Sequence, residues 1–178
     1  MAEPSGPPAT RRAATVREAK ALSHPLRLRI LRLCLHQELT NKQLAERLGR
    51  DPGTVLHHVR HLTEAGFLEQ GLVRTGTSGA LEKPYRSTGL SWWLSSPVLE
   101  QPLAPIEAFQ EELRESGPAS VRTYARFALH LSPDDIAAIE QRVGAIIDEY
   151  VRTEDQRPGQ PLHGGIFVLH QLAGQPPP

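Results

Sequence analysis

The sequence predicts an α+β fold, in which a mostly helical first half ends in a β-hairpin and a small α/β region follows. Three observations lead to this fold class. Residues 40–66 have the pattern of two short helices joined by a tight turn, and residues 67–88 then change to an extended, turn-interrupted pattern. Residues 91–174 contain a weaker succession of strand, helix and strand.

The first helix of the pair is expected to begin at Thr40. Thr40 and Gln43 have the spacing of a capping box, in which each side chain satisfies a free backbone amide of the other residue. Leu44 and Leu48 lie one turn apart and share a face. Gly49 supplies the left-handed conformation that ends many helices.

The second helix is expected from Pro52 to about Ala65, with Asp51 as its N-cap and Gly66 as its stop. At 100° per residue, Val55, Val59 and Leu62 fall on the inward face, and Leu56 and His58 flank it. The outer face carries polar side chains that are free to reach DNA, namely Gly53, Thr54, His57, Arg60 and His61, with Glu64 beside them.

The extended segment after this helix predicts a hairpin. Residues 67–74 contain β-formers, residues 75–79 form a turn-rich loop, and residues 81–88 return as a second strand. Pro84 lacks an amide hydrogen, so it is expected on an edge or at a bulge. A solvated hairpin with incidental charges would give the same pattern, but a hairpin placed here is typical of a DNA-binding wing.

These elements together predict a winged helix-turn-helix over residues 11–90, although an ordinary surface helix pair remains the alternative. Arginine and lysine on the hairpin would hold phosphates beside the groove that the second helix enters. The predicted DNA-contacting residues are Thr40, Asn41, Lys42, Gly53, Thr54, His57, Arg60, His61, Arg74, Lys83 and Arg86.

Residues 23–31 (SHPLRLRIL), the helix pair and residues 64–68 (EAGFL) resemble the ArsR-like bacterial transcriptional regulators. The resemblance covers about residues 13–89. It implies that residues 53–61 form the recognition helix and that residues 67–88 form the wing. Metal-sensing members of that family often carry a cysteine pair at the start of the first motif helix. Residues 38–42 of this chain contain no cysteine, so a thiolate metal sensor is not expected.

The zero net charge of the chain hides a division between its halves. Residues 11–90 carry a balance of +7, and residues 91–178 carry −6. The basic half is the one with the motif, as a DNA-binding module requires. The acidic half is better suited to dimerisation or effector contacts.

Composition sets further limits. The sequence has no apolar run of membrane-spanning length, and residues 1–10 lack the apolar core of a signal peptide, so a cytoplasmic protein is expected. Residues 1–10 and 175–178 are rich in proline and are expected to be disordered. Cys34 lies among leucines and is interpreted as a small buried residue, with a redox role unsupported.

Two helices are expected before the motif, over residues 11–22 and residues 24–36, the latter with Ser23 as its cap. In the second half, residues 106–116 and a segment beginning at Ser132 are expected to be helical. Strands are expected within residues 121–131 and 165–170, forming a unit too small to be stable alone. We expect it to pair with a second copy or to pack on the winged helix.

The histidines raise the question of a metal site. His57 and His61 are four residues apart on one helical face, a spacing that can bind a metal, but no carboxylate or cysteine accompanies them. DNA contact, or simple solvation, is the better interpretation. His130 and His170 lie on the two expected strands, where a ligand pocket is an alternative to structural roles.

The functional prediction is a homodimeric, sequence-specific transcriptional regulator that inserts residues 52–65 into the major groove. A winged-helix protein-interaction module without DNA binding is the competing hypothesis. The sequence contains no phosphate-binding glycine loop and no nucleophile elbow, so an enzyme is not expected, and neither is a cofactor. A small-molecule effector acting through residues 91–174 is left open.

Overall fold

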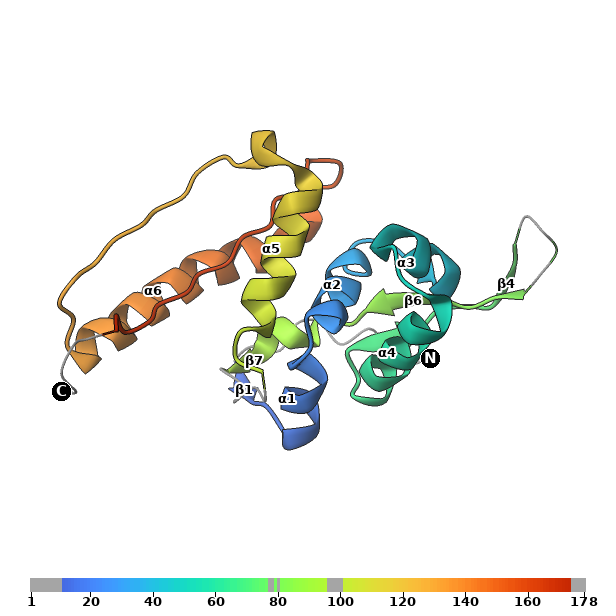
Figure 1. Ribbon diagram of the computed structural model, residues 1–178, viewed down its shortest axis with the longest axis horizontal. Coiled ribbons are helices and arrows are strands. Elements are labelled where there is room, and N and C mark those ends of the chain that lie inside the picture. The colour runs from blue at the N-terminus through green and yellow to red at the C-terminus, as the bar shows by residue number, and fades with distance from the viewer. Residues whose placement is uncertain (1–10, 77–78, 80, 96–100, 174–178) are drawn as a thin grey trace. The chain divides into compact units, whose positions relative to one another are not determined.

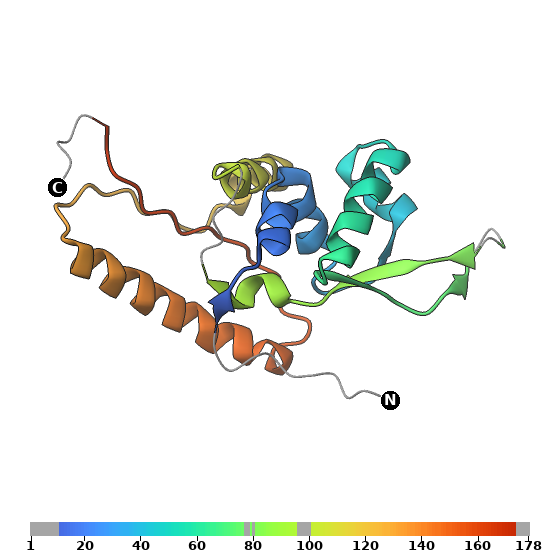
Figure 2. The ribbon, with the colours of Figure 1, turned by 90° about the horizontal axis from the view of Figure 1, so that it is seen from below.

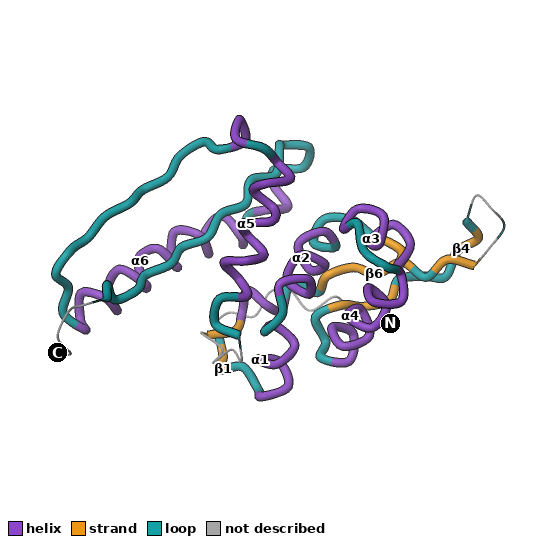
Figure 3. Tube along the Cα trace, in the orientation of Figure 1, coloured by secondary structure: helices purple, strands orange, loops and turns teal. Residues whose placement is uncertain are grey.

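A computed structural model describes residues 11–76, 79, 81–95 and 101–173 (Figures 1 and 2). It divides the chain into two compact units, residues 1–116 and residues 117–178. The fold mixes helices with short strands, as predicted (Figure 3). The first unit extends past residue 90, because a helix over residues 104–116 packs against the helix of residues 25–33.

The first unit begins with α1 (Val16–Leu22) and α2 (Pro25–Leu33), both shorter than expected. The N-cap of α2 is His24 rather than Ser23. The His24 Nδ1 atom accepts a hydrogen bond from the Leu26 amide at 3.1 Å. The Ser23 hydroxyl donates instead to the Ala19 carbonyl at the end of α1, at 2.8 Å, and so serves the preceding helix.

The motif and the last helix of this unit follow: α3 (Asn41–Leu48), α4 (Pro52–Glu64) and α5 (Ala104–Ser116). A three-stranded antiparallel sheet has β6 (Pro84–Ser87) at its centre, between β2 (Leu39–Thr40) and β3 (Leu68–Gln70).

The expectation that Pro84 lies on an edge or at a bulge is wrong, because Pro84 begins the central strand, opposite Thr40. A first strand position tolerates proline, since no amide hydrogen is needed there. The Pro84 carbonyl still accepts a hydrogen bond from the Gly71 amide at 2.9 Å.

Two further pairs of short strands complete the unit. β4 (Arg74–Thr75) and β5 (Leu81–Glu82) pair antiparallel in the outer part of the hairpin. β1 (Arg12–Ala13) pairs parallel with β7 (Leu94–Ser95), which follows the 3-10 helix η1 (Leu90–Trp93). In the segment of residues 91–94 (SWWL), Trp93 and Leu94 are buried. Arg11 stacks on the Trp92 ring, with its guanidinium carbon 4.7 Å from the ring centroid.

One continuous core joins α2, α3, α4 and the sheet. Its most enclosed members are Ile30, Leu44, Val55, Val59, Leu62 and Phe67. Cys34 belongs to the same cluster and is fully buried, as predicted. Burial raises the pKa of the Cys34 thiol to about 12, so the side chain is an unreactive apolar residue.

The second unit contains α6 (Pro133–Arg152), a 20-residue helix with a capping box between Ser132 and Asp135. Two 3-10 turns, η2 (Pro118–Ser120) and η3 (Glu154–Gln156), accompany it. The predicted helix is therefore present. None of the described residues of this unit is buried. The apolar stripe of α6 is half-buried at Ile139 and Val143 and exposed at Ile136, Ile146 and Tyr150.

The two strands predicted on either side of α6 do not form. Residues 121–131 and 165–170 are without assigned secondary structure, and Figure 3 draws them as loop. A strand requires a hydrogen-bonded neighbour, and the described part of this unit provides none to either segment. None of the helices in the described ranges has the length and apolar character needed to cross a membrane.

Candidate nucleic-acid interface

The turn between α3 and α4 follows the predicted local chemistry. Thr40 and Gln43 form the capping box of α3, and Gly49 ends that helix in the left-handed conformation, with φ 58°. The Asp51 side chain accepts a hydrogen bond from the Thr54 amide at 3.0 Å and caps α4. These contacts fix the angle at which α4 leaves the turn.

The inner face of α4 is anchored in the core. Val55, Val59 and Leu62 are each 0% exposed. His58, which the helical wheel placed beside the core face, is also buried and packs with its ring centroid 4.4 Å from that of His24. Because this face is fully used in packing, the opposite face of α4 is fixed toward solvent.

The outer face of α4 presents the polar set predicted for DNA contact. All of its members are exposed: Gly53, Thr54, His57, Arg60 and His61. The rings of His57 and His61 meet edge to face, with centroids 4.5 Å apart. Among the described residues, Arg60 forms no hydrogen bond or ion pair with the protein, so its guanidinium is available to an external partner.

The start of α3 is less accessible to DNA than predicted. Thr40 is buried, and its hydroxyl is engaged with Gln43, so it has no surface to offer DNA. The Asn41 side chain donates from Nδ2 to the Pro52 carbonyl at 2.9 Å and ties α3 to α4. Lys42 is well exposed and lies 4.0 Å from Glu46 one turn later.

The hairpin that follows α4 projects away from the helices as a narrow arm ending near β4 (Figures 1 and 2). Lys83 and Arg86 are exposed along it. Arg74 is exposed as well, although its Nε atom lies 3.4 Å from Oε2 of Glu82 on the paired strand. The arm therefore carries the three cations predicted for the wing.

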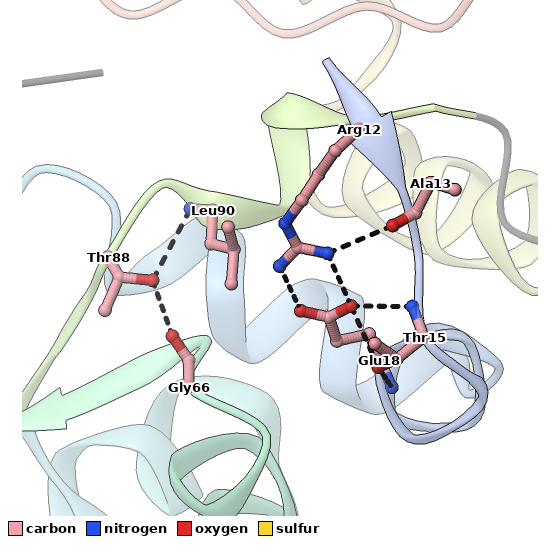
Figure 4. A network of polar contacts seen from close by, with 7 residues as sticks. All are labelled: Arg12, Ala13, Thr15, Glu18, Gly66, Thr88 and Leu90. Carbon is pink, nitrogen blue, oxygen red and sulfur yellow. Dashed lines mark hydrogen bonds and ion pairs between the residues drawn. The ribbon is translucent and has the colours of Figure 1, made fainter. Parts of the chain in front are cut away.

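Figure 4 shows two groups of polar contacts, one at the end of α4 and of the hairpin and one at the start of α1. The Thr88 hydroxyl donates to the Gly66 carbonyl at 2.8 Å and accepts from the Leu90 amide at 3.4 Å, which joins the end of α4 to the end of the hairpin. In the second network, Arg12 binds Glu18 at 2.9 Å. The Arg12 guanidinium lowers the pKa of the Glu18 carboxyl to about 2, helped by hydrogen bonds from Thr15.

The sequence family described as a helix-turn-helix domain matches residues 22–71, from the end of α1 to just beyond β3. The chain contains a helix-turn-helix domain. Together with the hairpin of residues 67–88, it is a winged one. No curated protein matches the chain. A solved structure of the transcriptional regulator SlyA is similar over 74% of this chain and 77% of its own, at 16% identity and a TM-score of 0.30.

Outside the winged helix-turn-helix lie the two histidines for which a ligand pocket was considered. His130 and His170 are exposed, and the His170 Nδ1 atom lies 3.2 Å from the Gln171 carbonyl oxygen. Among the described residues, no three histidine, cysteine, aspartate or glutamate side chains are grouped so that they could hold a metal ion.

The structure draws attention to two residues of the helix-turn-helix that were not among the predicted DNA contacts. Arg50 follows the turn glycine and is exposed, without a partner in the described part of the chain. His58 is buried, yet its Nδ1 atom has no hydrogen-bond partner there. The position of Arg50 directly after Gly49 was a usable signal, whereas the environment of His58 depends on α2 and was not.

Proposed function

We propose that the protein is a sequence-specific DNA-binding transcriptional regulator, in which α4 enters the major groove and the wing lies on the phosphate backbone. The observation that carries this proposal is the orientation of α4. Its apolar face is sealed in the core, while Arg60, His57 and His61 face outward together. The commonest sequence-specific contact in the major groove is an arginine side chain that donates hydrogen bonds to the edge of a guanine.

Charge supports DNA over a protein partner as the ligand of this surface. The winged helix-turn-helix carries most of the positive charge of the chain, and residues 91–178 carry the compensating negative charge. A protein-interaction module would not need cations on both the α4 face and the wing. We propose that the protein binds DNA and does not catalyse a reaction, and that it needs no cofactor. We also propose that it is cytoplasmic and of the ArsR-like kind.

The contact surface follows from exposure. We retain ten of the predicted residues and omit Thr40, because its hydroxyl is buried in the α3 cap. Asn41 is retained with a secondary role, since its Nδ2 atom is already bound to the Pro52 carbonyl. Base-reading positions are assigned to α4 and phosphate-holding positions to α3 and the wing.

The test is binding of the full chain to the DNA upstream of its own gene, measured by fluorescence anisotropy over a salt series. Affinity should fall linearly with salt on logarithmic axes. Arg60→Ala should weaken specific binding by about 1–3 kcal/mol, as expected for an arginine that reads a base. Arg32→Ala, on α2 and paired with Glu112, should leave the affinity within a factor of about two.

Absence of salt-dependent binding, or an equal effect of Arg60→Ala and Arg32→Ala, would reject the proposal. Binding that is strong but identical for specific and random DNA would keep DNA as the partner and remove sequence reading.

We further propose that the regulator is a homodimer, because the second unit is incomplete alone. α6 has no buried residue, and Ile146 and Tyr150 on its apolar stripe are 60% and 59% exposed. The extended residues 121–131 and 165–170 carry apolar side chains and have no strand partner in the described part of the chain. A second copy would supply both, and a two-fold dimer would place two α4 helices in successive major grooves.

Sedimentation equilibrium tests the dimer. Ile146→Lys should convert the full chain to a monomer, whereas Gln141→Lys, an exposed position of the same helix, should leave the mass unchanged. A wild-type monomer at all concentrations would contradict the proposed assembly without affecting the α4 surface.

A further inference from the structure

A cleft of about 280 Å³ opens in the first unit where the start of α2, the start of α4 and α5 meet. Its polar lining comes from His24, Arg50, Thr54, His58 and Glu111, and Pro25 and Leu26 supply an apolar wall. His24, Arg50 and His58 are not among the DNA-contacting residues proposed above.

His58 is the first indication that the cleft is a binding site. It is 8% exposed, and its Nδ1 atom is fully enclosed without a hydrogen-bond partner in the described part of the chain. A buried polar atom left unpaired costs free energy, so native structures seldom retain one without a function.

His24 supplies a hydrogen-bond donor. Its Nδ1 atom accepts the hydrogen bond from the Leu26 amide, so in the neutral ring the proton is carried by Nε2. Thr54 adds a hydroxyl on the first turn of α4, which lies 3.5 Å from Oδ1 of Asp51. Arg50 adds a planar guanidinium with no protein partner in the described residues. Three donors of this kind around one space match the oxygens of a phosphate group.

The surrounding charge favours an anion as well. The pKa of His58 is lowered to about 4, chiefly by burial, with electrostatic contributions from His24, Arg27, His57 and His61. The pKa of His24 is lowered by burial and by Arg27, against an opposing effect of Glu107. An anion in the cleft relieves this repulsion and favours protonation of both rings.

Glu111 is the acidic group on the rim of the cleft. Its Oε2 atom lies 2.6 Å from Nη1 of the buried Arg29, which also forms an ion pair with Glu115, so two carboxylates share one guanidinium. Arg50 is the lining cation that forms no ion pair in the described part of the chain, and it is the group that would hold an anion.

We propose that this cleft binds one phosphate-type oxyanion, with Arg50 as the charge partner and His24, Thr54 and His58 as hydrogen-bonding groups. The anion has two possible sources of the same chemistry, a backbone phosphate of bound DNA or the phosphate group of a small molecule. The DNA source rests on the proposed function, and the small-molecule source does not. Because Thr54 and His58 are on α4, either source couples occupancy of the cleft to the position of the recognition helix.

The test follows the ring nitrogens of the histidines by NMR in the full chain, titrated with inorganic phosphate at constant ionic strength. The signals of His24 and His58 should shift and saturate, while those of the exposed His130 should not move. Arg50→Gln should weaken the phosphate affinity about tenfold or more, as expected for loss of a charged hydrogen bond. Arg47→Gln, an exposed arginine of α3 outside the cleft, should change it by less than about twofold.

A second arm separates the two sources. If a DNA duplex that binds the protein displaces phosphate from the cleft, the site holds a backbone phosphate. If the duplex binds and phosphate remains, the site is for a free anion. Saturable phosphate binding without any DNA binding would retain the cleft and reject the proposed function.

The proposal is overturned if neither phosphate nor DNA shifts the His24 and His58 signals. It is equally overturned if the shifts rise without saturation and are the same in Arg50→Gln and Arg47→Gln, since that would indicate an adventitious ion only. Both variants alter exposed side chains, so loss of folding does not obscure the comparison.

Discussion

Arg29 on α2 is buried, and its Nη1 atom lies 2.6 Å from Oε2 of Glu111 on α5. Its Nη2 atom forms a second ion pair with Glu115, one turn further along the same helix. The guanidinium is thus enclosed by two carboxylates from a helix that follows the wing by sequence. This pairing explains why α5 is part of the first compact unit.

Arg29→Ala is expected to lower the free energy of unfolding by about 2 kcal/mol, measured by urea denaturation. Breaking a buried pair costs about 3–5 kcal/mol, but Glu111 and Glu115 are 35% and 55% exposed and regain part of their solvation. Arg32→Ala is the control, because its side chain is 47% exposed and lies 3.7 Å from Glu112. Equal losses in the two variants would contradict the special role of Arg29.

Leu62→Ala is expected to destabilise the winged helix-turn-helix by about 2–5 kcal/mol, since Leu62 is fully buried and truncation leaves a cavity. Arg60→Ala, two residues earlier on the exposed face, should alter stability by less than about 0.5 kcal/mol while reducing DNA affinity. Thermal unfolding of both variants measures the first effect. A stability loss in Arg60→Ala as large as that in Leu62→Ala would mean that the two faces are misassigned.

Gly49→Ala is expected to cost about 1–2 kcal/mol of folding free energy, because an L-residue is strained at φ 58°. A Cβ at this position meets no atom within 4 Å, so the cost is one of backbone conformation alone. Gly49→Asn should cost less, since asparagine visits the left-handed region more readily. Chemical denaturation distinguishes them, and an equal loss would point to a steric cause instead.

Lys83→Ala is expected to reduce the slope of log affinity against log salt by about one phosphate contact. Lys83 is exposed on the wing, where a phosphate contact is proposed. Lys20→Ala removes the same charge from the exposed side of α1 and should leave the slope unchanged. A slope that does not respond to Lys83→Ala would exclude the wing from the DNA backbone.

Glu18→Gln is expected to lower the folding stability at neutral pH and to make that stability less dependent on pH in the acid range. The pKa of Glu18 is depressed in the folded protein to about 2, chiefly by the hydrogen bond from Arg12, against an ordinary value of 4.5. A depressed carboxyl pKa adds stability above pH 4.5 that is lost as the pH falls toward 2. Melting temperatures at pH 7 and pH 3 should therefore differ less in the variant than in the wild type. An unchanged difference would show that Glu18 is not the acid-sensitive group.

The local chemistry of residues 40–66 was readable from the sequence. The capping box of Thr40, the left-handed Gly49 and the cap at Asp51 all occur as predicted, because each depends only on residues within one helical turn. The inward face of α4 was likewise predicted, since a 3.6-residue period is set by the order of apolar side chains. The burial of Thr40, which removes it from the DNA contacts, was not predictable in this way, because it depends on the pairing of β2 with β6.

The sequence by itself determined the two helices of the motif, the hairpin after them and the sign of charge on each half of the chain. Only the tertiary structure decided that Pro84 begins a central strand, that Arg29 meets Glu111, and that His24 and His58 face one cleft. It also decided that residues 121–131 and 165–170 have no strand partners within the described second unit. The physical reason is range: caps and helical periods act over a few residues, whereas strand pairing and burial depend on segments that are distant in sequence.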